Sequence, residues 1–142
     1  MIEFFDTTTL VAAMVEDEPH HEFCAGALGD ARAGYAASHS VAECFATLTG
    51  GRLGLHVSPA EAAALIRHNV HDRLTLVSLS PAEYLKVVES AGPAGARGGA
   101  VYDLLLLTCA RKVKAARIHT LNRRHFVALA PDLEPRLSTP GP

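Results

Sequence analysis

The strongest constraint on the fold is an alternation of short apolar runs with helix signals along the whole chain. Residues 2–5 form an apolar run interrupted only by Glu3, and further short runs lie at residues 34–38, 74–79 and 117–121. Short strands separated by helices are typical of a parallel sheet with helices on its faces. We therefore expect an α/β sandwich with a central, largely parallel sheet.

Capping signals predict where several of the helices begin. Residues 58–61 and 80–83 both read Ser-Pro-Ala-Glu, with a capping serine, a proline at the first helical position and a glutamate at the third. Residues 40–43, Ser-Val-Ala-Glu, fit a capping box that opens a helix to about Leu48. Helical composition predicts further helices over residues 7–15, 20–31 and 100–113, the last of them buried because it is apolar nearly all round.

The length of 142 residues suits a single domain with a sizeable core. We place this domain over residues 1–130 and expect the proline-rich tail, residues 131–142, to be extended or loose. The glycine-rich segment at residues 92–99 is expected to form a flexible loop before the buried helix.

Several features argue for a cytoplasmic protein without a membrane segment. The longest strongly apolar stretch, residues 104–107, is far too short to span a bilayer, and the N-terminus lacks the basic region of a signal peptide. The three cysteines are an odd number at wide spacing, so they imply no disulfide framework.

The net charge of −2 hides an asymmetry between the two parts of the chain. Residues 1–96 hold 5 basic against 12 acidic residues, whereas residues 97–142 hold 8 basic against 3 acidic residues. A basic cluster is the electrostatic footprint of a protein that binds a phosphate backbone. A solvated helix face with charges that complement a helix end would give the same pattern.

Four polar residues lie where predicted strands end or helices begin. Asp6 follows the first strand and is either a helix N-cap or a ligand. Glu43 is either part of the capping box or faces a cleft, because its helical neighbours are small or polar. Asp103 lies one turn into the buried helix, where a carboxylate needs a functional partner or a salt bridge such as Arg97. Asn122, after the last strand, is most simply an N-cap.

Three acids near helix beginnings suit the binding of a hard cation. Mg²⁺ and Mn²⁺ take carboxylate oxygens and keep waters that substrate phosphates can replace. A metal held in this way can activate water and stabilise the leaving oxygen in phosphodiester cleavage.

The order of these motifs resembles the PIN-domain ribonucleases, and particularly the VapC toxins of bacterial toxin–antitoxin pairs. The resemblance rests on Asp6-Thr-Thr, on Val-Ala-Glu43, on Val-Tyr-Asp103 and on Thr-Leu-Asn122-Arg-Arg-His-Phe, and it covers essentially residues 1–130. It implies a PIN-like α/β/α sandwich and a metal-dependent endoribonuclease that hydrolyses RNA by metal-activated water.

The resemblance also implies roles for individual residues. Asp6, Glu43 and Asp103 would hold Mg²⁺ or Mn²⁺, and Asn122 would join them in catalysis. Asn122 departs from the family, whose commoner residue at this position is aspartate, so a second metal is expected to bind weakly. Arg97, Arg123 and Arg124 would contact the RNA backbone, although Arg97 is equally able to pair with Asp103. The expected partners are a homodimer mate and an antitoxin that places a cationic group in the acidic site; we expect no further cofactor.

Two other functions remain open at this point. Because Asn122 stands where the family has a fourth acid, the chain could be a catalytically silent PIN-like module that binds RNA or protein. A small phosphotransfer domain built on Asp6 is a weaker alternative, since no paired acid lies beside Asp6.

Overall fold

A central sheet of five parallel strands forms the middle layer of the computed structural model, which describes residues 1–51 and 53–141. The strands, in the spatial order β3-β2-β1-β4-β5, are β1 (Ile2–Phe5), β2 (Ala33–Ala37), β3 (Thr75–Val77), β4 (Arg117–His119) and β5 (Leu137–Ser138). Every neighbouring pair is parallel. The predicted α/β sandwich with a largely parallel sheet is therefore confirmed.

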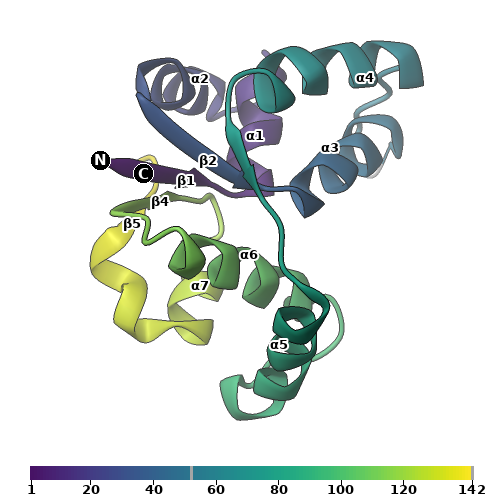
Figure 1. Cartoon of the computed structure of the whole chain (residues 1–142). Helices are drawn as coiled ribbons and strands as arrows, with labels where there is room; N and C mark the ends of the chain where they lie inside the picture. The colour runs from purple at the N-terminus through teal and green to yellow at the C-terminus, as the bar shows by residue number, and fades with distance from the viewer. Residues whose placement is uncertain (52, 142) are drawn as a thin grey trace.

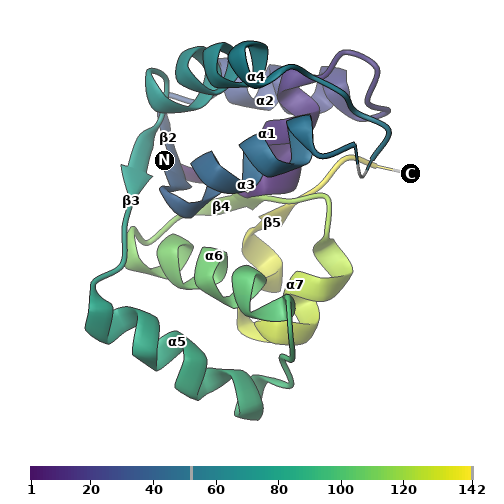
Figure 2. The same ribbon diagram turned by 90° about the vertical axis from the view of Figure 1, so that its right-hand side faces the viewer.

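Helices cover both faces of the sheet, with the first four on one side and the last three on the other (Figure 1). The first layer consists of α1 (Thr7–Met14), α2 (His21–Asp30), α3 (His39–Thr49) and α4 (Pro59–Ile66), and a π-helical turn over Arg67–His71 continues α4. The second layer consists of α5 (Pro81–Ala94), α6 (Ala100–Lys112) and α7 (Arg123–Leu129), as the rotated view in Figure 2 also shows. Within the described residues, no helix has the length and apolar character needed to cross a membrane.

The strands are apolar because each of the two layers covers one of their faces. Phe4 packs with Ile118 and Leu105 in the core shared with α5, α6 and α7. Phe5, its neighbour in β1, points to the opposite face and packs with Leu10 in the core shared with α1 to α4. A parallel sheet covered on both sides needs such continuous apolar runs, which is why the sequence pattern identified the four longer strands.

Two of the three predicted helix caps are confirmed. Ser80 and Glu83 form the full reciprocal capping box, and Ser58 accepts a hydrogen bond from the backbone of Glu61. The capping box predicted for Ser40 is wrong, because α3 begins earlier, at His39, and Ser40 lies inside its first turn. Its hydroxyl instead lies 2.9 Å from the Thr7 hydroxyl, toward the site described below.

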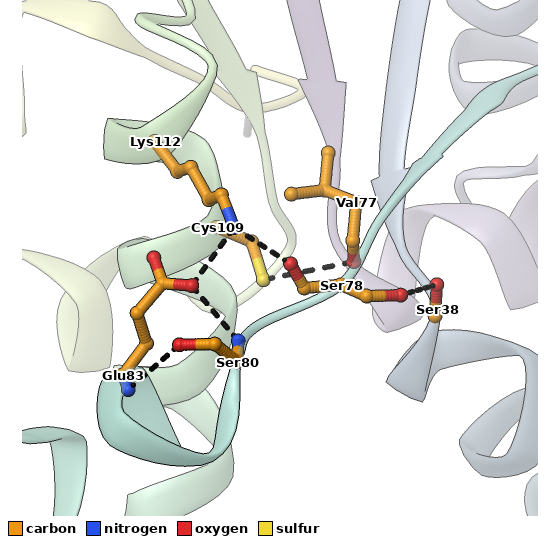
Figure 3. A network of polar contacts seen from close by, with 7 residues as sticks. All are labelled: Ser38, Val77, Ser78, Ser80, Glu83, Cys109 and Lys112. Carbon is orange, nitrogen blue, oxygen red and sulfur yellow. Dashed lines mark hydrogen bonds and ion pairs between the residues drawn. The ribbon is translucent and has the colours of Figure 1, made fainter. Parts of the chain in front are cut away.

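A polar network joins the connection between β3 and α5 to the end of α6 (Figure 3). Lys112 donates hydrogen bonds to the carbonyl of Ser78 and to Glu83 Oε1, both at 2.9 Å. The Ser78 hydroxyl in turn lies 2.7 Å from the hydroxyl of Ser38, just before α3. The capping bond from the Ser80 backbone and the ammonium of Lys112 together lower the pKa of Glu83 to about 2. This network holds the connection from β3 to α5 against the end of α6 and against Ser38.

Two segments differ from the sequence expectation. Helix α5 continues to Ala94, so Gly92 and Pro93 belong to its last turn, and it ends at Gly95 in the left-handed conformation that favours glycine (φ 76°). The segment expected to be extended or loose after residue 130 forms a 3-10 helix over Pro131–Arg136, followed by β5. The two-residue strand β5 is too short to give a sequence signal of its own.

Candidate active site

Asp6 is buried at the carboxyl end of β1, where it caps α1. Its Oδ1 accepts hydrogen bonds from the Thr9 backbone at 2.9 Å and the Thr8 hydroxyl at 2.7 Å, and its Oδ2 accepts one from Thr120 at 2.6 Å. Only 1% of the residue is exposed. Burial raises the pKa of Asp6, and the hydrogen bonds from Thr120, Thr9 and Thr8 oppose that rise. Both carboxylate oxygens of Asp6 therefore already have partners.

Glu43 lies on the second turn of α3 and is tied to the beginning of α1. The Thr7 hydroxyl donates to Glu43 Oε1 at 3.0 Å and also lies against Ser40. His39, one turn earlier on α3, places its Nε2 3.3 Å from the same oxygen. That distance fits an ion pair when His39 is protonated, but the angles are not those of a hydrogen bond. Glu43 is therefore a partly exposed side chain that accepts a hydrogen bond from α1, and it does not cap α3.

Asp103 faces a cavity of about 600 Å³ that it shares with Glu43 and Asn122. The rest of the lining comes from α6, α7 and the loop before α6: Gly99, Ala100, Tyr102, His125, Ala128 and Leu129. Among the described residues, none donates a hydrogen bond to Asp103 or forms a salt bridge with it. Partial burial raises the pKa of Asp103, His125 opposes the rise and Glu43 adds to it. Asp103 is thus a half-buried carboxylate whose oxygens are available to a ligand.

Asn122 lines this cavity and is also joined to Asp6 through Thr120. Its backbone N–H donates to the Thr120 hydroxyl at 2.9 Å, and that hydroxyl donates to Asp6. Asn122 occupies the residue before α7, but its side chain makes no capping hydrogen bond there. The amide instead belongs to the lining of the cavity. Of the two interpretations of Asn122, side-chain capping is therefore the wrong one.

Comparison with known proteins identifies the fold that carries this cavity. The model of the PIN domain family matches residues 4–130. The chain belongs to the PIN domain family. No curated protein sequence matches it significantly.

Two solved structures share this PIN fold. The first is VapC20 of Mycobacterium tuberculosis, a sarcin–ricin loop cleaving toxin, with 14% identity, a TM-score of 0.66 and coverage of 82% of this chain and 86% of that chain. The second is VapBC2 from Rickettsia felis bound to a DNA fragment from their promoter, with 18% identity, a TM-score of 0.69 and coverage of 99% of this chain and 100% of that chain. At these identities the likeness shows a shared fold.

Nucleases of the PIN family generally use divalent metal ions, and the donor set of the cavity fits such an ion in part. Glu43, Asp103 and Asn122 offer the oxygen donors that Mg²⁺ and Mn²⁺ prefer, and the oxygens of Asp103 have no partner within the described part of the chain. Among residues 1–51 and 53–141, however, no three His, Cys, Asp or Glu side chains are grouped closely enough to hold a metal. Asp6 is not part of the cavity lining; it is buried, and its oxygens accept hydrogen bonds from the surrounding threonines.

The three arginines predicted to contact RNA lie in different surroundings. Arg97 is exposed, and within the described part of the chain it forms no ion pair with Asp103. Arg124 is exposed at the start of α7. Arg123 pairs with Glu134 at 3.3 Å and lines a different cavity, beside β4 and β5. Of the three, Arg123 thus has an ion-pair partner and lines a cavity other than the one at Asp103.

Two residues of the cavity, Tyr102 and His125, were not identified from the sequence. His125 is the third residue of α7, one turn beyond Asn122, which directly precedes this helix, and both residues line the cavity. Tyr102 directly precedes Asp103 and is an exposed aromatic residue in a helix that is otherwise largely buried. The helical spacing from Asn122 could have identified His125, whereas the exposure of Tyr102 depends on tertiary packing.

Proposed function

We propose that this chain is a metal-dependent endoribonuclease of the VapC type that acts as the toxin of a toxin–antitoxin pair. The observation that carries the proposal is the carboxylate of Asp103, which has no partner among the described residues and shares a cavity with Glu43 and Asn122 in a PIN fold. The resemblance of the motifs and the shared fold with VapC structures support the same function. Because the proposed reaction occurs on RNA inside the cell, we expect a cytoplasmic location.

Each residue of the cavity has a proposed role. Asp103 and Glu43 would hold Mg²⁺ or Mn²⁺ together with Asp6, the third acid of the family pattern. When bound, the metal supplies an activated water and charge stabilisation for the leaving oxygen. Thr7 keeps Glu43 in place through its hydrogen bond. The amide of Asn122 would orient the attacking water, since it brings an oxygen without a charge.

The RNA and the protein partners follow from charge. Arg97, Arg123 and Arg124 are proposed contacts to the RNA backbone; Arg123 would first have to leave its ion pair with Glu134. An antitoxin would inhibit the enzyme by placing an arginine or similar cation beside Asp103 and Glu43, because two neighbouring carboxylates without metal attract any cation. We also propose a homodimer, as the VapC resemblance implies.

The test is cleavage of purified RNA by protein freed of any antitoxin. Wild-type protein and Asp103→Asn are incubated with total RNA in Mg²⁺, in Mn²⁺ and in chelator, and the fragments are separated by size. We expect discrete fragments that require both the metal and Asp103. Identical fragments from Asp103→Asn, or from wild-type protein in chelator, would contradict the assignment.

A catalytically silent RNA- or protein-binding module is the second candidate. The uncharged Asn122 and the lack of a close group of three acids among the described residues favour it. It predicts that folded wild-type protein cleaves nothing in either metal but still binds RNA or a partner protein in chelator. In that case Asn122→Asp is the first variant to assay for restored cleavage.

A further inference from the structure

Tyr102 places an exposed aromatic ring at the wall of the Asp103 cavity. It directly precedes Asp103 on α6 and lines the same cavity as Glu43 and Asn122. Its exposed fraction is 49%, although four leucines that follow Asp103 in the same helix are buried. The ring therefore lies beside the carboxylates and remains accessible to a ligand.

His39 supports one face of this ring. The two ring centroids are 5.2 Å apart and the planes are inclined by 12°, which is a stacked arrangement between α3 and α6. His39 is itself held close to Glu43, at 3.3 Å between Nε2 and Oε1. Through His39, the Tyr102 ring is thus held near Glu43, a proposed metal ligand. Tyr102 is also the chain neighbour of Asp103.

We propose that Tyr102 is a nucleobase-binding residue, on whose accessible surface an unpaired base of the RNA stacks. This inference rests on the proposed ribonuclease function and names how one nucleotide is held beside the Asp103 cavity. Proteins bind single-stranded RNA by stacking splayed bases on aromatic side chains. The ring is already fixed by His39, so little side-chain freedom is lost when a base stacks on it.

Stacking would let this negatively charged cavity bind RNA through a contact that does not depend on charge. Asp103 and Glu43 repel an RNA phosphate until a cation neutralises them. A base on Tyr102 contributes affinity that does not depend on that charge, and any base can provide it because every base has a π-face. Tyr102 therefore favours an unpaired nucleotide over a paired one without selecting its identity.

The experiment measures binding of a short single-stranded RNA that contains 2-aminopurine, whose fluorescence falls when the base is stacked. Asp103→Asn serves as the parent, since it removes the proposed cleavage and part of the repulsion. In this background Tyr102→Ala is expected to weaken binding about tenfold and to abolish the fluorescence decrease. Tyr102→Phe is expected to match the parent, because it keeps the ring.

Tyr84→Ala is the matched control. Tyr84 lies on α5 with 44% of its surface exposed, and it is outside the lining of the Asp103 cavity. We expect binding by Tyr84→Ala to equal that of the parent. His39→Ala, which removes the support of the ring, should give a partial loss of the fluorescence decrease.

The outcomes separate this inference from the proposed function. If wild-type protein cleaves RNA but Tyr102→Ala binds the probe as the parent does, the stacking role is wrong and the nuclease assignment stands. If Tyr102→Leu binds as tightly as Tyr102→Phe and gives the same fluorescence decrease, apolar bulk rather than stacking is responsible and the inference also fails. A parent that binds no RNA, from a wild type that cleaves none, would overturn both.

Discussion

Asp6 and Asp103 are both acids at helix starts, yet their surroundings differ in almost every respect. Asp6 is 1% exposed and accepts hydrogen bonds from Thr8, Thr9 and Thr120. Asp103 is half-buried, faces a cavity and has no hydrogen-bond donor among the described residues. Burial raises the pKa of both carboxyl groups; in Asp6 hydrogen bonds reduce that rise without cancelling it, whereas Asp103 has no such hydrogen bonds among the described residues.

The comparison shows that the two carboxylates have different primary tasks. Asp6, at the end of β1, accepts hydrogen bonds from Thr8 and Thr9 at the start of α1 and from Thr120 after β4. These bonds hold the three segments together. Asp103 makes no hydrogen bond or salt bridge within the described residues, so its carboxylate oxygens are available to a ligand. An unpaired, partly buried carboxylate is unfavourable for stability and is typical of a functional site.

The largest expected effect is the loss of cleavage in Asp103→Asn. Removing this carboxylate should lower the rate of RNA cleavage roughly 100- to 1,000-fold, as for other single groups that stabilise charge in a transition state. The same variant should melt about 2–4 °C higher than wild type, because an uncompensated charge disappears from a half-buried position. A cleavage assay and a thermal melt on one preparation check both. A variant that cleaves normally, or that melts lower, breaks the contrast with Asp6.

Asp6→Ala should lower stability in addition to slowing cleavage, because Asp6 caps α1 and is also a proposed acid of the metal site. It removes the α1 cap and leaves the Thr9 N–H and the Thr120 hydroxyl without an acceptor, so we expect the free energy of unfolding to fall by about 2 kcal/mol. Urea unfolding measures the change. Thr120→Ser, which keeps the hydroxyl, is the control and should retain most of the stability. Unchanged stability in Asp6→Ala would show that its hydrogen bonds do not hold the strand ends together.

Asn122→Asp tests how the number of carboxylates in the Asp103 cavity affects metal binding. A third carboxylate in the lining should raise the affinity for Mn²⁺ about tenfold, since cation affinity grows with the number of charged ligands. Isothermal titration of wild-type and variant protein with Mn²⁺ provides the measurement. An unchanged affinity would place Asn122 outside the reach of the metal.

The smallest expected effect is a pH dependence of stability. A carboxyl group whose pKa is raised on folding destabilises the protein once it ionises, so its effect is absent below its ordinary value of 3.8 and grows as pH rises through the folded pKa. The stability advantage of Asp103→Asn over wild type should therefore appear only as pH increases above about 3.8. Urea unfolding of both proteins from pH 3 to pH 7 tests this. An advantage that is constant with pH would exclude ionisation as its cause.

The sequence predicted the fold well because the sheet is covered on both sides. Continuous apolar runs and serine caps mark four strands and most helices without any tertiary information. The capping box at Ser40 failed because α3 begins before it, at His39, and the Ser40 and Glu43 side chains contact Thr7 of α1 instead. The two-residue strand β5 depends on pairing with β4 and carries no pattern of its own.

The candidate site was only partly accessible to the same reasoning. Asp103 was identified because a charge in an apolar helix is conspicuous, and no residue in 1–51 or 53–141 forms a salt bridge with it. The closed environment of Asp6 was not foreseen, because the donor Thr120 belongs to a distant loop. Tyr102 was missed because its exposure and its stacking on His39 arise only when the tertiary fold brings the His39 and Tyr102 rings together.

The measurement that tests the central claim most directly is the shift in melting temperature that Mn²⁺ produces. Ligands that bind only the folded state raise its stability. The account predicts that Mn²⁺ raises the melting temperature of wild-type protein and of Glu89→Gln, an exposed acid on α5, but not of Asp103→Asn. An equal shift in Asp103→Asn and wild type would contradict the claim that Asp103 is the acid available to a metal.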